Sequence, residues 1–225
     1  MCNAYNVTTN VQAIIDAVKG WKARQNIKNQ PWLPGIYPNY SAPILRLVDD
    51  ELELTEALWG MPTPPQFNVN SKGEPLAYDR GVTNIRNVSS PHWRRWLGQA
   101  HRCLVPFTTF SEPDAKHKNH FFRFVDGREV AFMAGVYAPL TRQIKKSDPA
   151  PTEGLFYGFL TTSPNAQVAP IHAKAMPVIL TEDYELETWL KADWPVAKEL
   201  QRPLADGLLQ SAPAEDRMAE QSSLL

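Results

Sequence analysis

The sequence lacks the features that mark several specialised protein classes. Its 225 residues include only two cysteines, Cys2 and Cys103, which excludes a disulfide framework and a zinc site built from several cysteines. No apolar run approaches the roughly 18 residues that a membrane-spanning helix needs. The N-terminal residues lack the charged-then-apolar pattern of a secretory signal. There is also no glycine-rich phosphate loop and no internal repeat. We therefore expect a cytoplasmic protein (nucleoid-associated if bacterial) without membrane association.

The net charge is close to zero, but the charged residues are unevenly distributed. The net charge is −1, which by itself argues against nonspecific binding to nucleic acid. Between residues 80 and 102, however, there is no Asp or Glu and there are five arginines, at positions 80, 86, 94, 95 and 102. A basic patch of this kind fits a track for phosphates, or else a solvated surface paired with acids elsewhere.

The pattern of apolar residues predicts an α+β fold: a single domain with an antiparallel β-barrel-like core and peripheral helices. Helices are expected at 10–24, 90–99 and 181–191, and strands at 43–48, 51–59, 102–107, 120–125, 130–137, 155–162 and 176–180. Asp126-Gly127 predicts a hairpin turn between the strands on either side of it. The domain is expected to span residues 1–205, and residues 206–225 are expected to be a disordered tail.

Cys2 carries the most specific chemistry. Removal of Met1 would leave a terminal amine and a thiol on one residue, with ordinary pKa values of about 7.7–8.0 and 8.5. A useful fraction of both groups would then be nucleophilic near neutral pH. The amine condenses with an aldehyde to an imine, and the adjacent thiol closes a five-membered thiazolidine. The alternative is an incidental terminal residue.

Three further side chains could complete such a site, and each also has a plain structural reading. Glu112 follows an apolar strand, where burial would raise its pKa and suit it to move protons, or it simply ends a loop. His172 lies between two apolar strands as a second proton carrier or a structural residue. Asn84 could orient the substrate or form a turn. The tryptophans at positions 59, 93 and 96 suit either base stacking or core packing.

Several short motifs occur in an order that resembles the SOS response-associated peptidase (SRAP) family, whose members process abasic sites. They span about residues 1–205: Met1-Cys2-Asn3, Tyr40-Ser41-Ala42-Pro43, Trp59-Gly60-Met61-Pro62, Asn84-Ile85-Arg86, Arg102-Cys103-Leu104-Val105-Pro106 through Glu112, Met133-Ala134-Gly135, Thr161-Thr162 with Asn165, and Ile171-His172 with Met176-Pro177-Val178. The chain departs from the usual family pattern by carrying Asn3-Ala4 in place of Gly-Arg, and by one extra residue between His172 and Met176.

The resemblance implies a function and a set of site residues. It implies that Cys2, freed by removal of Met1, forms a covalent thiazolidine with the ring-opened abasic sugar in single-stranded DNA, with autopeptidase and strand-cleaving lyase activities also expected. Cys2, Asn84, Glu112 and His172 match the active-site residues. By the same matching, the positions near the DNA are Pro43, Arg86 and Thr161. We expect a monomer that needs no metal or other cofactor.

Two other functions remain open on sequence alone. One is a cysteine peptidase or amidohydrolase with an N-terminal nucleophile, in which the amine of Cys2 acts as a base and the thiolate attacks a carbonyl. The other is a module that binds single-stranded DNA without chemistry. Turnover of an amide substrate would favour the first, and binding that is indifferent to changes at Cys2 would favour the second.

Overall fold

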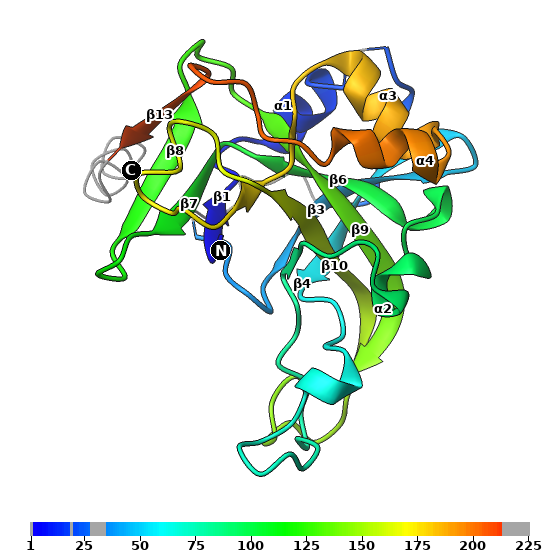
Figure 1. The fold of residues 1–225 in the computed structure, drawn as a ribbon. Helices are drawn as coiled ribbons and strands as arrows, with labels where there is room; N and C mark the ends of the chain where they lie inside the picture. The colour runs from blue at the N-terminus through cyan, green and yellow to red at the C-terminus, as the bar shows by residue number, and fades with distance from the viewer. Residues whose placement is uncertain (1, 19, 28–34, 213–225) are drawn as a thin grey trace, which may run out of the picture.

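The computed structural model describes residues 2–18, 20–27 and 35–212. Its centre is a closed barrel of five strands, in the order β10–β4–β3–β6–β9 and back to β10 (Figure 1). The barrel strands are β3 (Ser41–Val48), β4 (Glu51–Trp59), β6 (Arg102–Phe107), β9 (Ala131–Arg142) and β10 (Thr152–Thr162). Four of the five strand pairs are antiparallel, and β10 runs parallel to β4. The predicted α+β barrel is therefore confirmed, with one parallel seam that the sequence did not indicate.

Short strands extend the barrel sheet, and a second sheet lies beside it. The extensions are β2 (Ala23–Gln25), β5 (Asn84–Ile85), β11 (Met176–Pro177) and β12 (Ile179–Leu180). The second sheet has the order β1–β7–β8–β13, formed by β1 (Ala4–Asn6), β7 (Thr109–Pro113), β8 (Asn119–Phe124) and β13 (Leu209–Ala212). The N-terminal strand thus joins a sheet at the side of the barrel, and this placement positions the residues that flank it.

The barrel interior is filled largely by aromatic side chains. Trp59 stacks on Phe159 with ring centroids 5.3 Å apart, and Tyr5 meets Trp59 edge to face at 5.2 Å. The hydroxyls of Tyr5 and Tyr157 are hydrogen-bonded to each other at the centre of this group. Rings in such offset and edge-on contacts add to the free energy gained by burying their area. The N-terminal strand is therefore anchored in the core by Tyr5.

The helices are short and peripheral. They are α1 (Val11–Asp16), α2 (Pro91–Arg94), α3 (Asp183–Lys191) and α4 (Trp194–Ala197), with 3₁₀ turns η1 (Pro65–Phe67), η2 (Gln99–His101) and η3 (Lys198–Leu200). Asn10 caps α1 and Ser90 caps α2, as expected. The sequence also suggested Thr181 as the cap of the helix at 181–191, but the cap of α3 is Glu182, in a capping box with Glu185. None of the described helices is long and apolar enough to cross a membrane.

Two expected helices are much shorter than predicted. The one at 10–24 ends at Asp16, and the chain then turns at Gly20, which has a φ of +89°. Residues Ala23–Gln25 then pair in parallel with β4 as β2. The one at 90–99 ends at Arg94 and is followed by the separate turn η2. The first segment is redirected by pairing with a distant strand. In the second, local turns such as the bond from Trp96 N–H to the carbonyl oxygen of Trp93 replace a continuous helix.

The predicted hairpin at Asp126-Gly127 is wrong. A turn does form there, with Gly127 at a φ of +73° and the Arg128 side chain paired with the Asp126 carboxylate. However, β8 pairs with β7 and β13, whereas β9 pairs with β6, β10 and β12. The turn passes the chain from one sheet to the other, because both edges of β8 are already occupied.

The expected disordered tail contains an ordered strand. Leu209–Ala212 form β13, which pairs with β8 so that Leu209 is opposite Phe124. Leu209 is buried, which explains why the chain remains ordered beyond residue 205. The expected tail is therefore wrong for residues 209–212, while residues 213–225 lie outside the described residues.

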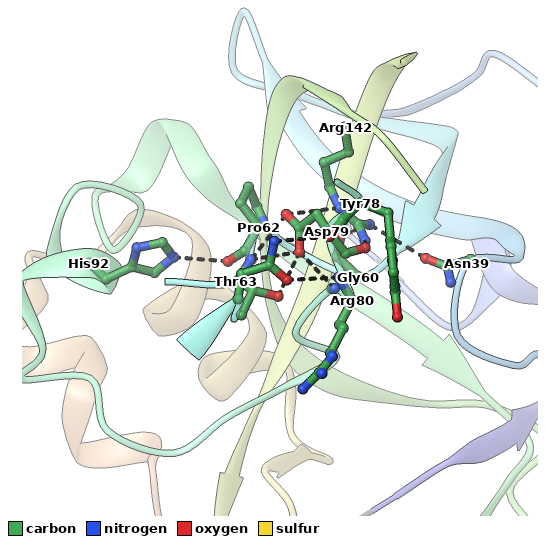
Figure 2. A network of polar contacts seen from close by, with 11 residues as sticks. Asn39, Gly60, Pro62, Thr63, Tyr78, Asp79, Arg80, His92 and Arg142 are labelled. Carbon is green, nitrogen blue, oxygen red and sulfur yellow. Dashed lines mark hydrogen bonds and ion pairs between the residues drawn. The ribbon is translucent and has the colours of Figure 1, made fainter. Parts of the chain in front are cut away.

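A buried arginine fastens the long loop between β4 and β5 to the barrel (Figure 2). The guanidinium of Arg142 donates to the carbonyl oxygens of Gly60 and Asp79, and its Nε lies 3.4 Å from the Asp79 carboxylate. That carboxylate also accepts hydrogen bonds from Thr63 and from the backbone of Gly81. A Cβ at Gly81 would lie 2.5 Å from the arginine, so glycine is required there. This loop leads directly into β5.

Candidate active site

Strand pairing fixes the position of Cys2. In the antiparallel pair of β1 and β7, Ala4 is opposite Ser111, so the chain leads back to Cys2 alongside Glu112 and Pro113. The Cys2 side chain is buried, and its thiol donates to the carbonyl oxygen of Ala4 at 3.3 Å. The Ser111 hydroxyl lies 3.1 Å from the same carbonyl. The residue with the most specific predicted chemistry is thus held inside the protein by the strand that follows it.

Glu112 is fully buried at the end of β7, next to Cys2. Burial raises the pKa of its carboxyl group to about 7, while a hydrogen bond from the backbone of Cys2 acts in the opposite direction. The expectation that burial would raise this pKa is confirmed. A carboxyl group with a pKa near neutrality exchanges protons readily in both directions, which is the property that a general acid–base group needs.

The pKa of the Cys2 thiol is shifted in the same direction as that of the Glu112 carboxyl group. Burial raises the pKa of the thiol well above its ordinary value, and the nearby charge of Glu112 raises it further. The expectation that a useful fraction of thiolate is present near neutral pH concerns the chain freed of Met1 and stays a prediction. In the chain that still carries Met1, the thiol keeps its proton until a base accepts it.

His172 approaches Glu112 from the segment between β10 and β11. Its Nδ1 lies 3.3 Å from the Glu112 carboxylate and 2.9 Å from the carbonyl oxygen of Ala175. Since a carbonyl oxygen only accepts hydrogen bonds, this contact assigns the proton to Nδ1. The backbone N–H of His172 donates to the carbonyl oxygen of Val168 at 2.8 Å and fixes the turn. The extra residue before Met176 is accommodated in the loop, and the imidazole still reaches the carboxylate.

Asn84 closes the cluster from the side of the barrel. It lies in β5, which pairs in parallel with β10 so that Asn84 is opposite Phe159. Its Nδ2 donates to the carbonyl oxygen of Cys2 at 2.9 Å and to the Thr83 hydroxyl at 2.8 Å. The structure therefore brings all four predicted active-site residues into one cluster, in which Asn84 contacts the buried Cys2 and His172 contacts the buried Glu112.

The three positions predicted to face DNA have different surroundings. Arg86 is exposed two residues beyond Asn84, and its guanidinium donates to the Ser163 hydroxyl at 3.1 Å. Thr161 is buried in β10, one residue beyond the segment that pairs with β5. Pro43 is buried in β3 opposite Glu56, so its position is set by the barrel rather than by the Cys2 cluster.

The basic segment is only partly a surface. Arg102 is buried, and its guanidinium donates to the carbonyl oxygens of residues 97, 189 and 192. Trp59, Trp93 and Trp96 are also buried, so the reading of these rings as base-stacking platforms is wrong and they belong to the core. The exposed arginines of the segment are those at positions 80, 86, 94 and 95.

Two further residues near the cluster gave no signal in the sequence analysis. The side-chain amide of Gln201 donates to the carbonyl oxygens of Arg86 and Thr161, at 2.9 and 3.0 Å, and so ties the ends of β5 and β10 together. Lys174 is exposed two residues after His172. Only its proximity in sequence to His172 could have indicated Lys174, and no local pattern indicates Gln201.

Within the described residues, no group of three or more His, Cys, Asp or Glu side chains is arranged to hold a metal ion. The site combines a buried thiol, a carboxyl group of near-neutral pKa and an imidazole. The carboxamide of Asn84 holds the backbone of the cysteine. Fold and site together define a single-domain α+β barrel protein with a buried cysteine–glutamate–histidine cluster beside its N-terminal strand.

The chain belongs to the SRAP family. The family model described as "SOS response associated peptidase (SRAP)" matches residues 1–220. The family is thus described as a peptidase, with a link to the response to DNA damage. A comparison with curated protein sequences gives no significant match.

Solved structures share the fold. A protein from Bordetella bronchiseptica has 19% sequence identity and a TM-score of 0.70, over 95% of this chain and 99% of that one. A protein from Bacteroides thetaiotaomicron has 19% identity and a TM-score of 0.71, over 97% and 94%. A phage-related protein from Bordetella bronchiseptica has 16% identity and a TM-score of 0.66, over 95% and 94%.

Proposed function

We propose that this protein captures abasic sites in single-stranded DNA by forming a covalent thiazolidine through Cys2 after Met1 has been removed. The observation that carries the proposal is the position of Glu112. Its buried carboxyl group, with a pKa of about 7, lies beside the residue whose nitrogen and sulfur would both react. Membership of the SRAP family supports a role in the response to DNA damage.

The first step joins the amine of Cys2 to the aldehyde of the ring-opened sugar. The nitrogen adds to the aldehyde carbon and gives a carbinolamine, which loses its hydroxyl group as water and becomes a protonated imine. Loss of water requires a proton on the departing hydroxyl, and the protonated form of Glu112 supplies it. His172, 3.3 Å from that carboxylate, assists ring opening of the sugar or the reversal of the adduct.

The second step closes the ring. The sulfur of Cys2 bonds to the carbon of the protonated imine, the C=N double bond becomes a single bond, the thiol gives up its proton, and the ring nitrogen keeps the proton that it carries. Because burial raises the pKa of the thiol, the now ionised Glu112 is needed to accept that proton. The complete reaction releases one water. Asn84 holds the Cys2 carbonyl oxygen at 2.9 Å and so orients the residue during both steps. β-Elimination from the imine would give a strand-cleaving lyase side reaction.

The same cluster supports removal of Met1 by the protein itself. Hydrolysis of the bond between Met1 and Cys2 transfers an OH group from water to the Met1 carbonyl and a proton to the Cys2 nitrogen. Glu112 is placed to deliver that proton, because the backbone of Cys2 is hydrogen-bonded to it. The description of the family as a peptidase favours this second activity.

The test is the intact mass of the full chain before and after incubation with an oligonucleotide that carries one abasic site. The expected protein lacks Met1, and the product has the mass of protein plus DNA minus one water. An oligonucleotide with a stable tetrahydrofuran analogue of the abasic site has no aldehyde and serves as the control. If the reactive oligonucleotide gives no covalent product, the proposed function is wrong.

A further inference from the structure

The turn between β7 and β8, residues 114–118, lies beside the Cys2 cluster. β1 approaches Pro113 as the chain runs back toward Cys2, and on the other side of β7 Glu112 is opposite His120. Opposed and alternate residues share one face of a hairpin, so Glu112, Asp114 and His120 lie on the same face. Glu112 is buried at the inner end, whereas Asp114 and His120 are partly exposed.

Asp114 gives this turn a defined shape. Its Oδ1 accepts from the backbone N–H groups of Lys116 and Lys118, at 2.8 and 3.0 Å, and its Oδ2 accepts from His120 Nε2 at 2.9 Å. The bond from His120, followed by those from the backbone of the two lysines, lowers the pKa of Asp114 to about 2. The turn is therefore built around an ionised carboxylate, which fixes the backbone that carries its other side chains.

Those side chains include two exposed cations, Lys116 and Lys118. Residues 3–10, which contain β1, carry no Lys or Arg. Cys2 is also contacted by Asn84 of β5, and two residues further along the chain is the exposed Arg86. Cationic side chains thus flank the reactive residue on two sides, one group on the β5 side and one on the turn of the β7–β8 hairpin.

We propose that Lys116 and Lys118 bind phosphates of the DNA on the side of the abasic site opposite the phosphates that Arg86 binds. The strand then runs from the end of β5, over Cys2, to the turn at 114–118. This inference rests on the proposed function for its substrate, single-stranded DNA. Phosphates occur on both sides of an abasic sugar, so a protein that centres the sugar on Cys2 meets charge on both sides.

The first measurement is the salt dependence of binding to an oligonucleotide with one tetrahydrofuran abasic analogue, which binds without reacting. Each phosphate contact to a single strand contributes about −0.7 to the slope of log affinity against log salt. Lys116→Ala/Lys118→Ala is therefore expected to make the slope shallower by about 1.4. A slope equal to that of the wild type overturns the proposal.

The matched control is Lys145→Ala/Lys146→Ala. These exposed lysines lie in the turn between β9 and β10. That turn is at the far end of β10 from Thr161, roughly 30 Å away at about 3.3 Å per residue. The control is expected to keep the wild-type slope. If the control makes the slope as much shallower as Lys116→Ala/Lys118→Ala does, the loss of positive charge anywhere on the surface explains the effect and the proposal is overturned.

The second measurement locates the contacts on the DNA. Methylphosphonate linkages remove phosphate charge on one side of the abasic analogue at a time. With neutral linkages on the side that the turn contacts, Lys116→Ala/Lys118→Ala should have no further effect, while Arg86→Ala should still weaken binding. Neutral linkages on the other side should give the reverse. If neutral linkages on one and the same side abolish the effects of both variants on binding, the proposed course of the strand is wrong.

Covalent capture of reactive abasic DNA is measured on the same samples, so that the two hypotheses fail separately. If the wild type forms the adduct but the variant at 116 and 118 keeps the wild-type salt slope, the turn is not a DNA contact and the proposed function stands. If the wild type forms no adduct but Lys116→Ala/Lys118→Ala still makes the salt slope shallower, the capture chemistry is wrong and the DNA contact at the turn stands.

Discussion

Among the places where the molecule buries a charged group, the surroundings of Arg142 and those of Cys2 differ in how the buried group is compensated. Around Arg142, the guanidinium has two backbone carbonyl oxygens and the Asp79 carboxylate, and that carboxylate has further donors from Thr63 and Gly81. Around Cys2, the Glu112 carboxyl group is buried so deeply that its pKa rises to about 7, and the thiol beside it is also held in its neutral form.

The difference separates a structural network from a reactive one. Burying a charge is tolerated where an opposite charge and hydrogen bonds compensate it, as at Arg142. The Cys2 cluster instead contains an acid whose ionisation is costly and a thiol that needs a base, and such departures from full compensation are expected at functional sites. Changes at Cys2 and Glu112 should therefore alter chemistry, whereas changes at Arg142 should alter stability.

The largest effect is expected at Cys2. Cys2→Ser keeps the amine but cannot close a thiazolidine, so the heat-stable adduct with abasic single-stranded DNA should be absent on a denaturing gel. Adding one residue before Cys2 turns its amine into a non-nucleophilic amide, and the stable adduct should be absent there too. Both variants should bind the tetrahydrofuran analogue like the wild type. A stable adduct from the protein with the blocked amine would rule out the thiazolidine.

The next effect is on rate. Glu112→Gln keeps the size of the side chain but cannot exchange a proton, and a positioned acid–base group typically contributes about 10²–10⁴-fold. Single-turnover crosslinking should slow by a factor in that range while binding to the unreactive analogue changes little. His172→Ala should act on ring opening or reversal and leave the final crosslinked fraction nearly unchanged. Crosslinking of Glu112→Gln at the wild-type rate would remove this residue from the mechanism.

The third prediction concerns the structural network. Arg142→Leu removes the cation from a buried pair and leaves carbonyl oxygens without donors, which should lower the free energy of unfolding by about 3 kcal/mol. Urea denaturation measures this. Arg142→Lys keeps the charge but not the planar fork, so it should recover only part of the loss. Crosslinking per folded molecule should be unchanged, and a loss of crosslinking without a loss of stability would show that the two regions are not separate.

Local patterns in the sequence predict some of the fold and not the rest. The bounds of β4 (Glu51–Trp59) and β6 (Arg102–Phe107) agree with the prediction, because alternation and a short apolar run are local signals. Residues 23 and 24 were expected to be helical but belong to β2, because their partner is a strand almost thirty residues away. The parallel pairs of β10 with β4 and β5 likewise join segments far apart in the sequence.

The candidate site, like the fold, is only partly predictable from local sequence patterns. Cys2 stands out by its chemistry and Glu112 by its place after an apolar strand, so both could be singled out from the sequence. The bond from Asn84 to the Cys2 carbonyl oxygen depends on how β5 pairs with β10, and no local pattern indicates it. Arg102 was counted with the surface charges, because a sequence does not reveal that carbonyl oxygens from residues 97, 189 and 192 surround it.

The last expected effect is the pH dependence of stability that Glu112 causes. Its pKa in the folded protein is about 7, against an ordinary value of 4.5, and burial is the main cause. Below pH 4.5 the group is protonated in both the folded and the unfolded states and affects neither. As the pH rises from 4.5 to 7, the unfolded chain loses this proton and the folded protein keeps it, so the free energy of unfolding falls by about 3 kcal/mol, at 1.36 kcal/mol per pKa unit. Above pH 7 this loss of stability is complete.

Glu112→Gln has no proton to lose, so its stability relative to the wild type should rise by about 3 kcal/mol between pH 4.5 and 8. Urea denaturation of both proteins at each pH measures the difference, and other titrating groups cancel because the two proteins share them. A difference that does not change with pH would show that Glu112 ionises in the folded protein as it does in the unfolded chain. Its burial would then not distinguish the reactive cluster from the Arg142 network.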